Sequence, residues 1–115
     1  MDLQKRRQPL IFMCITNRPD IASIAEHNTV DRIWVDLEKR GKVERQGHVD
    51  SVKSNHTMID VSRIRNTISK ADLLVRINPL WEGSQYEIDE VIARGADIVM
   101  LPMFRSAEVE SIKMV

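Results

Sequence analysis

Arg76 is the residue of this chain whose surroundings most clearly indicate chemistry. It lies near the end of an apolar run, residues 73–79, with the sequence Leu-Leu-Val-Arg-Ile-Asn-Pro. Runs of this kind are typical of buried parallel strands. An unpaired guanidinium inside a packed sheet is costly. We therefore expect Arg76 where its strand emerges, at the carboxyl edge of the sheet, which is where α/β proteins bind ligands.

A second strand segment supplies carboxylates that can meet this arginine. Because side chains alternate faces along a strand, Asp36 and Glu38 share one face of their segment, and Arg76 and Asn78 share one face of theirs. Two interpretations stay open. Arg76 can form an internal ion pair with Asp36 or Glu38 that only stiffens the sheet, or it can make a bidentate contact with the carboxylate of a ligand.

The three histidines differ in the chemistry that they suggest. His27 falls at the end of a predicted helix, where a cation is favoured. His48 lies in the middle of a charged segment. His56 directly precedes a predicted helix start, near the point where Asp36 emerges, and a histidine oriented there by a carboxylate can act as a general base. An ordinary loop histidine is the alternative.

Composition excludes several classes of protein. The 17 basic and 17 acidic residues cancel and the sequence pI is 6.8, so nothing favours a nucleic-acid partner or an acidic membrane surface. No apolar stretch reaches the roughly 20 residues of a membrane span, and no export signal is evident. Cys14 is the sole cysteine, which rules out an intrachain disulfide. No metal-binding motif is evident. We expect a cytoplasmic protein.

The pattern along the chain alternates strands with helices. The expected strands span residues 10–15, 32–37, 72–78 and 97–101, and the first helix spans 19–27. A second helix is expected to open at Thr57, with Asp60 in a variant of the capping box. A third opens with a capping box of Ser84 and Glu87 and ends at Gly95. A fourth helix starts at Ser106.

Helical spacing predicts which side of each helix is buried. In the first helix Ile21, Ile24 and Ala25 are expected to face the core. The second and third helices should bury the stripes Val61, Ile64, Ile68 and Ile88, Val91, Ile92. One domain, residues 1–115, is expected, with a long charged insertion at 38–56. Such alternation predicts a parallel sheet, either open and doubly wound or part of an eight-stranded barrel.

Three segments together resemble the HpcH/HpaI aldolase/citrate lyase family. They are residues 33–38 (Ile-Trp-Val-Asp-Leu-Glu), residues 74–78 (Leu-Val-Arg-Ile-Asn) and residues 95–103 (Gly-Ala-Asp-Ile-Val-Met-Leu-Pro-Met). The resemblance implies a (β/α)8 barrel, often hexameric, that makes or breaks carbon–carbon bonds next to a pyruvate-like or acyl-CoA enolate. It also implies Mg²⁺ or Mn²⁺ as cofactor.

The same resemblance assigns roles to individual residues. Arg76 matches the arginine that binds the keto acid and stabilises the enolate oxygen, and Asn78 is expected to orient the substrate. Asp36 and Glu38 match the acidic residues of the family's Asp-x-Glu-His segment. Lys39 stands where the family has its histidine, so His56, beyond the charged insertion, is the expected replacement as proton carrier.

The resemblance implies only the N-terminal half of the barrel. The family's metal-binding Glu and Asp follow its fifth and sixth strands, and four strands are expected here, so no metal ligand falls within this chain. We expect a fragment of a metal-dependent lyase acting on a 2-keto acid or related carboxylate, joined by a homo-oligomeric partner or a complementing C-terminal half. The alternative is a non-catalytic, flavodoxin-like binding or assembly module. In the complete enzyme, Arg76→Ala is expected to abolish turnover and leave the fold intact.

Overall fold

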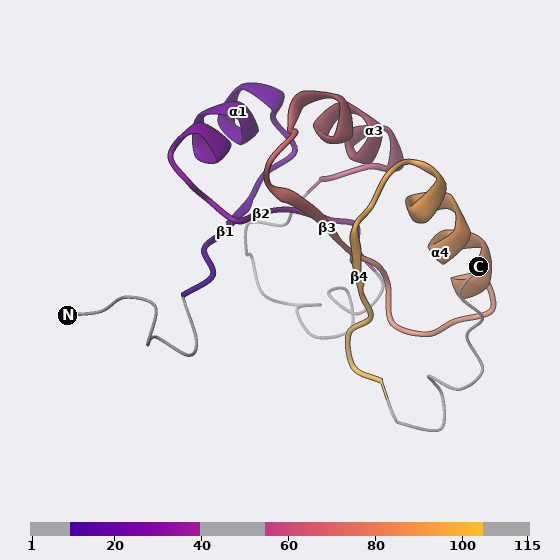
Figure 1. Ribbon diagram of the computed structural model, residues 1–115. Helices are drawn as coiled ribbons and strands as arrows, with labels where there is room; N and C mark the ends of the chain where they lie inside the picture. Colours follow the sequence, from indigo (N-terminus) through magenta and orange to yellow (C-terminus); the bar gives the residue numbers. More distant parts are fainter. Residues whose placement is uncertain (1–9, 40–54, 105–115) are drawn as a thin grey trace.

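A computed structural model of the chain describes residues 10–39 and 55–104 (Figure 1). Its strands form one parallel sheet in the order β1 (Met13–Ile15), β2 (Arg32–Asp36), β3 (Asp72–Arg76), β4 (Ile98–Met100). Helices α1 (Pro19–His27), α3 (Met58–Thr67) and α4 (Ser84–Ala93) alternate with them. The predicted α/β class with four parallel strands is confirmed. His48, most of the charged insertion and the helix expected from Ser106 lie outside the described residues.

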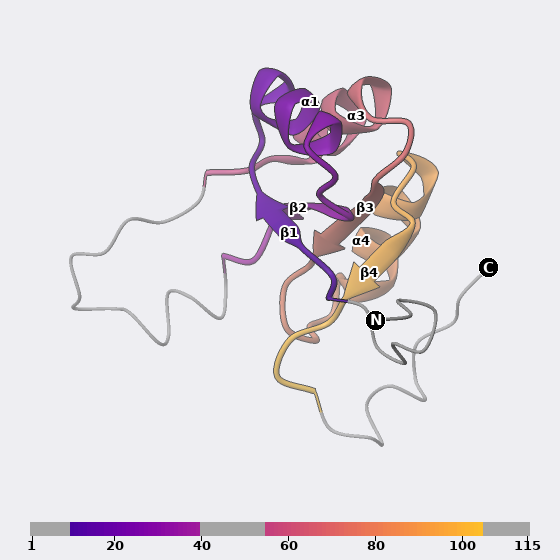
Figure 2. The same ribbon diagram turned by 60° about the vertical axis from the view of Figure 1, so that its left-hand side comes forward.

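The three helices of the described residues lie on one side of the sheet. Figure 1 shows them side by side as an arc over the strands, with α3 between α1 and α4, and Figure 2 shows the same layering from a second direction. A doubly wound sheet has helices on both faces, and its strand order reverses at a switch point. The described residues instead form a singly wound sheet with sequential strand order, so the flavodoxin-like arrangement does not describe them.

The core fills the space between the sheet and the helices. Alternate strand residues point into it, as the period of two requires. Its fully buried members from strands and helices are Ile33, Val35, Leu73, Val75, Val61, Ile64 and Val91, joined by Leu37, Ile68, Ile77 and Ile88. Each such side chain contributes about 1.5–3 kcal/mol on burial. The predicted stripes of the second and third helices are therefore confirmed, with Ile92 only partly buried.

The helix ends follow the sequence signals in part. α3 starts as expected, because the Asp60 carboxylate accepts the Thr57 N–H at 2.8 Å. Gly95 follows α4 with φ +106°, the left-handed conformation expected of a helix-ending glycine. The predicted box of Ser84 and Glu87 is wrong. The Ser84 hydroxyl accepts the Trp81 N–H at 2.8 Å, and Glu87 makes tertiary hydrogen bonds instead.

The buried face of α1 also differs from the prediction. Ala22 is fully buried and Ala25 partly so, whereas Ile21 is 36% and Ile24 61% exposed. The helix packs on α3 and β2, and small side chains allow that close contact. The isoleucine stripe expected in the core therefore lies on an uncovered side of the described residues.

Candidate functional site

Arg76 and Asp36 meet at the carboxyl edge of the two central strands. The two residues are register partners on β3 and β2, and both side chains point to the face of the sheet opposite α1, α3 and α4. Arg76 Nε donates to Asp36 Oδ1 at 3.0 Å and Nη2 donates to Oδ2 at 2.7 Å. Glu38 Oε2 lies 3.1 Å from the same Nε. The ion pair that we considered from sequence is thus present, with both carboxylates in it.

The guanidinium is held along one of its two edges. Asp36 occupies the edge made by Nε and Nη2, and the Trp34 ring lies 5.0 Å from Arg76 Cζ, a cation–π contact on one face. Within the described residues, Nη1 has no hydrogen-bonding partner. The edge made by Nη1 and Nη2 therefore keeps two donors in the fork geometry that suits a second carboxylate.

The charges of Arg76, Asp36 and Glu38 do not cancel one another. The hydrogen bonds that Arg76 donates to Asp36 raise the pKa of the guanidinium against the opposing effect of burial, and the charges of Asp36 and Glu38 raise it further. The arginine side chain is 22% exposed, whereas the two carboxylates are 3% and 0% exposed. With all three ionised, this triad of Asp36, Glu38 and Arg76 carries a net charge of one negative unit.

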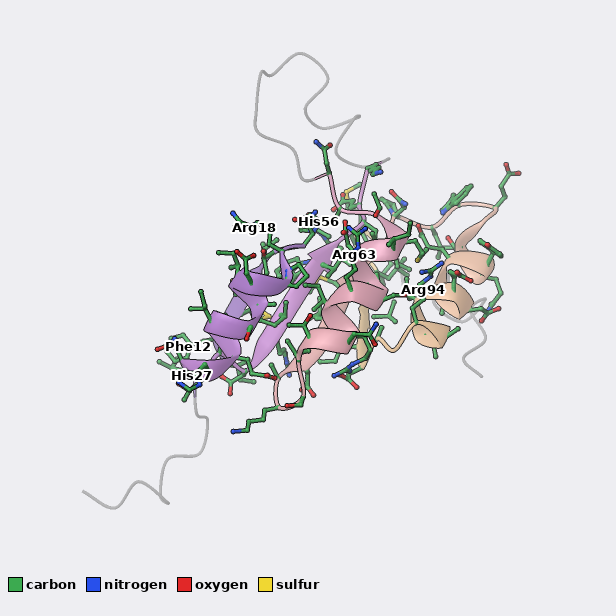
Figure 3. All side chains as sticks on the ribbon, turned by 90° about the horizontal axis from the view of Figure 1, so that it is seen from above. Phe12, Arg18, His27, His56, Arg63 and Arg94 are labelled. Atoms are coloured by element: carbon green, nitrogen blue, oxygen red, sulfur yellow. The ribbon has the colours of Figure 1, made fainter. Side chains whose placement is uncertain are left out.

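His56 lies beside the triad, buried to 7% exposure. It does not contact the Asp36 carboxylate in the way that the sequence suggested. Instead, the Asp36 main-chain N–H donates to His56 Nδ1 at 2.8 Å. A ring nitrogen that accepts an N–H carries no proton, so the neutral imidazole holds its proton on Nε2. Figure 3 places His56 with Arg18 toward one end of the strands, and His27 with Phe12 toward the other.

Asn78 joins three elements at the same edge. Its Oδ1 accepts the Lys39 N–H at 2.7 Å, and its Nδ2 donates to Glu87 Oε2 at 2.7 Å. The Asn78 N–H also donates to Glu87 Oε1 at 3.2 Å. These contacts tie the end of β3 to α4 and to the chain after β2, which favours a positioning role for Asn78. Sequence reasoning missed Glu87, because its spacing from Ser84 also fits a helix cap.

Asp60 is a second carboxylate that sequence reasoning treated only as a cap. Its Oδ2 accepts hydrogen bonds from Thr57 and from Asn17 Nδ2, the latter at 3.2 Å, so it links the turn after β1 to the start of α3. Burial alone would raise the pKa of Asp60, but the hydrogen bonds that it accepts from Thr57 and Asn17 lower it below its ordinary value of 3.8.

A cavity of about 670 Å³ lies at the opposite, amino edge of the strands. Its lining includes Glu26, His27, Arg32 and Asp72, and no residue of the triad. The Glu26 carboxylate accepts the main-chain N–H groups of residues 69, 70 and 71 at 2.6–2.9 Å, and these bonds, chiefly that from residue 71, lower its pKa. These bonds fasten α1 to the chain before β3, so we interpret them as structural and place the candidate site at the carboxyl edge.

No group of three His, Cys, Asp or Glu residues able to hold a metal ion occurs within residues 10–39 and 55–104. No helix in that part of the chain is long and apolar enough to cross a membrane. No family model, curated protein or solved structure matches the sequence or the fold. The family resemblance therefore enters the functional argument only as a proposal.

Proposed function

We propose that this chain supplies the arginine-bearing half of a (β/α)8 barrel in a metal-dependent carbon–carbon lyase. The substrate class is a pyruvate-like 2-keto acid or a related carboxylate, processed through an enolate. The singly wound sheet with sequential strand order supports the barrel half, because a closed barrel has that winding and keeps all its helices outside. The proposed location is the cytoplasm.

One observation carries the proposal, namely the way in which Arg76 is held. Asp36 binds the guanidinium along the edge made by Nε and Nη2. This contact orients the other edge, made by Nη1 and Nη2, and leaves that edge able to donate to a ligand. Stacking on Trp34 limits rotation of the group further. An incoming carboxylate at the second edge would accept two parallel charge-assisted hydrogen bonds, and the enolate oxygen next to it would lie near the same positive charge.

The two neighbouring polar residues have narrower roles in this proposal. His56 would donate a hydrogen bond to the substrate from Nε2, which carries the proton of the neutral ring while Nδ1 accepts the Asp36 N–H. Asn78 would hold the edge of the sheet in place through Lys39 and Glu87. Asp36 would orient Arg76 through its carboxylate and His56 through its main chain.

The described residues do not by themselves fit a divalent cation. Asp36 and Glu38 are both engaged with Arg76, and no third ligand accompanies them within the described ranges. We therefore derive no step through Mg²⁺ or Mn²⁺. A ligand carboxylate would raise the negative charge at the triad from one unit to two, so tight binding needs positive charge from outside the triad. In the proposal, a complementing C-terminal half or a second copy contributes the remainder of the pocket.

Oxalate, a stable analogue of the pyruvate enolate, tests the proposal. Isothermal titration of the full chain with oxalate, with and without Mg²⁺, is expected to show binding that Arg76→Lys weakens by about tenfold or more. The lysine keeps the charge but loses the fork, and one charge-assisted hydrogen bond is worth at least about 1.4 kcal/mol. Arg94→Lys is the matched control, because Arg94 lies away from the triad and donates to Glu90 of α4 and to Ser62 of α3. Equal oxalate affinity in both variants, or none in the wild type, would remove Arg76 from ligand binding.

A further inference from the structure

The end of the molecule formed by β1 and α1 exposes a cluster of large apolar side chains. We call this surface the β1–α1 end, and its members are Leu10 (74% exposed), Ile11 (51%), Phe12 (58%), Met13 (45%), Ile15 (52%), Ile21 (36%) and Ile24 (61%). Single exposed apolar residues are ordinary, but a group gathered on adjacent elements marks an interaction surface.

Both layers of the fold contribute to this end. The Glu26 side of α1 faces the chain after α3, since its carboxylate binds the main chain of residues 69–71. At about 100° per residue, Ile21 and Ile24 lie about 140–160° around the helix from Glu26. They therefore lie on the side of α1 turned away from α3. The strand beneath, β1, pairs only with β2 within the described residues.

At the opposite end of the sheet, β4 also has an edge to which no described strand is paired. β4 pairs only with β3 among the described strands, and its residues Ile98 and Met100 are partly exposed. Met103 and Phe104, just after it, are 56% and 54% exposed. We call β4 with Met103 and Phe104 the β4 end. Unpaired strand edges beside apolar side chains are sites where a further strand adds.

We propose that the partner covering both ends is a second copy of this chain. In this dimer β4 of each copy pairs in parallel with β1 of the other, so that a two-fold axis closes eight strands into one barrel. The inference names the partner for the barrel half proposed above and rests on that part of the proposal. The β1 and β4 edges of one chain run in the same direction. Each chain therefore carries both edges that the contact needs, one for each neighbouring edge of the partner copy.

The face of the sheet without helices fits this partner. Ile15, Trp34, Leu74 and Ile98 are aligned in register across the four strands and form an apolar row on that face. Closure would place the two rows inside the barrel, facing each other. Pairing of β1 with a second β1 about a two-fold axis would be antiparallel and would leave the β4 end uncovered, together with the partly exposed Ile98 at that end of the row.

Light scattering coupled to size exclusion tests the partner. The full chain, 13.3 kDa, is expected to run at twice that mass and to dissociate on dilution. Ile24→Lys at the β1–α1 end and Met103→Lys at the β4 end are each expected to weaken the dimer by about 100-fold, because each change occurs in both symmetric contacts. Ile59→Lys on α3 is the matched control: Ile59 is 56% exposed and lies outside both ends, so the dimer should persist.

A mixture of the two variants tests the head-to-tail arrangement. Each homodimer has a lysine in both contacts, whereas the mixed dimer concentrates both lysines in one contact and keeps the other intact, so mixing should restore dimer. Circular dichroism of each variant verifies that it is folded. A monomer at all concentrations, an unaffected Met103→Lys dimer, open polymers, or equal dissociation by Ile59→Lys would each overturn the proposal. A monomer that still binds oxalate through Arg76 would reject this partner and retain the proposed ligand class.

Discussion

Replacing Arg76 with alanine tests whether Asp36 and Glu38 are ionised around the arginine. The change would leave Asp36 and Glu38, which are 3% and 0% exposed, without the guanidinium between them. Breaking a buried ion pair by removing one partner costs about 3–5 kcal/mol. Because the arginine side chain is itself 22% exposed, we expect the lower end, about 3 kcal/mol. For a domain of this size that loss lowers the unfolding midpoint by about 12–24 °C.

The assay is urea unfolding followed by circular dichroism, arranged as a double-mutant cycle. Asp36→Asn removes one of the two negative charges. It should lower the free energy of unfolding less in the Arg76→Ala background than in the wild type, because in that background the Asp36 carboxylate has already lost the guanidinium. Arg94→Ala is the control: its partner Glu90 is 29% exposed, so we expect a loss below about 1 kcal/mol.

Two results would refute this reasoning. An Arg76→Ala protein no less stable than Arg94→Ala would mean that the carboxylates are not ionised around the arginine. Strictly additive effects of Arg76→Ala and Asp36→Asn would mean that the 2.7 Å contact between them carries no coupling. The prediction also revises the sequence-based expectation that Arg76→Ala leaves the fold intact. Arg76→Lys is the safer variant for function, because it keeps the charge.

Three further predictions concern the framework around the triad. Asp60 has a lowered pKa in the folded protein, so its contribution to stability is present above its ordinary value of 3.8 and is lost as the pH falls through the folded pKa. The stability gap between wild type and Asp60→Asn should therefore shrink below about pH 4 in urea titrations at several pH values, and a constant gap would contradict the assignment. Asn78→Ala removes the side-chain donor to the buried Glu87 carboxylate and the acceptor of the Lys39 N–H, and should cost about 2 kcal/mol in the same assay, whereas an unchanged free energy of unfolding would show that these two side-chain hydrogen bonds are dispensable. Gly95→Ala should cost about 1–3 kcal/mol, because φ is +106° and the Arg65 side chain occupies the space of a Cβ; an unchanged unfolding midpoint would argue against that conformation.

The sequence predicted those features whose signals are local. Alternation along residues 73–77 correctly separated the face of β3 that packs into the core under the helices from the face that carries Arg76, because side chains in a strand have a period of two. The start of α3 at Thr57 and Asp60 was also predictable, since a capping box needs residues only three positions apart. Alternation with helices predicted a parallel sheet, whose strands bring Asp36 and Arg76 to one edge, and left the strand order open.

Features that depend on distant partners could not be predicted in the same way. The spacing of Ser84 and Glu87 fits a helix cap, in which the Glu87 carboxylate would accept one main-chain N–H. In the structure Asn78 offers this carboxylate two donors, its main-chain N–H and its Nδ2. Helical periodicity placed Ile21 and Ile24 in the core, and the packing of α1 through Ala22 decided otherwise. His56 was expected beside a carboxylate, and it is the Asp36 main chain that reaches its ring.

Two features of the described residues call for a partner, the exposed apolar ends and the net negative charge of the triad. A second copy of the chain answers only the first. The exposed apolar ends need cover, which a second copy can give. The triad needs positive charge before a carboxylate binds tightly, and a second copy adds its own triad with the same net negative charge. Dimerisation alone should therefore leave oxalate binding weak, in wild type and in the Ile24→Lys monomer alike. Isothermal titration of both proteins decides the point, since tight, Mg²⁺-independent binding by the dimer alone would show that the two triads are compensated within the assembly.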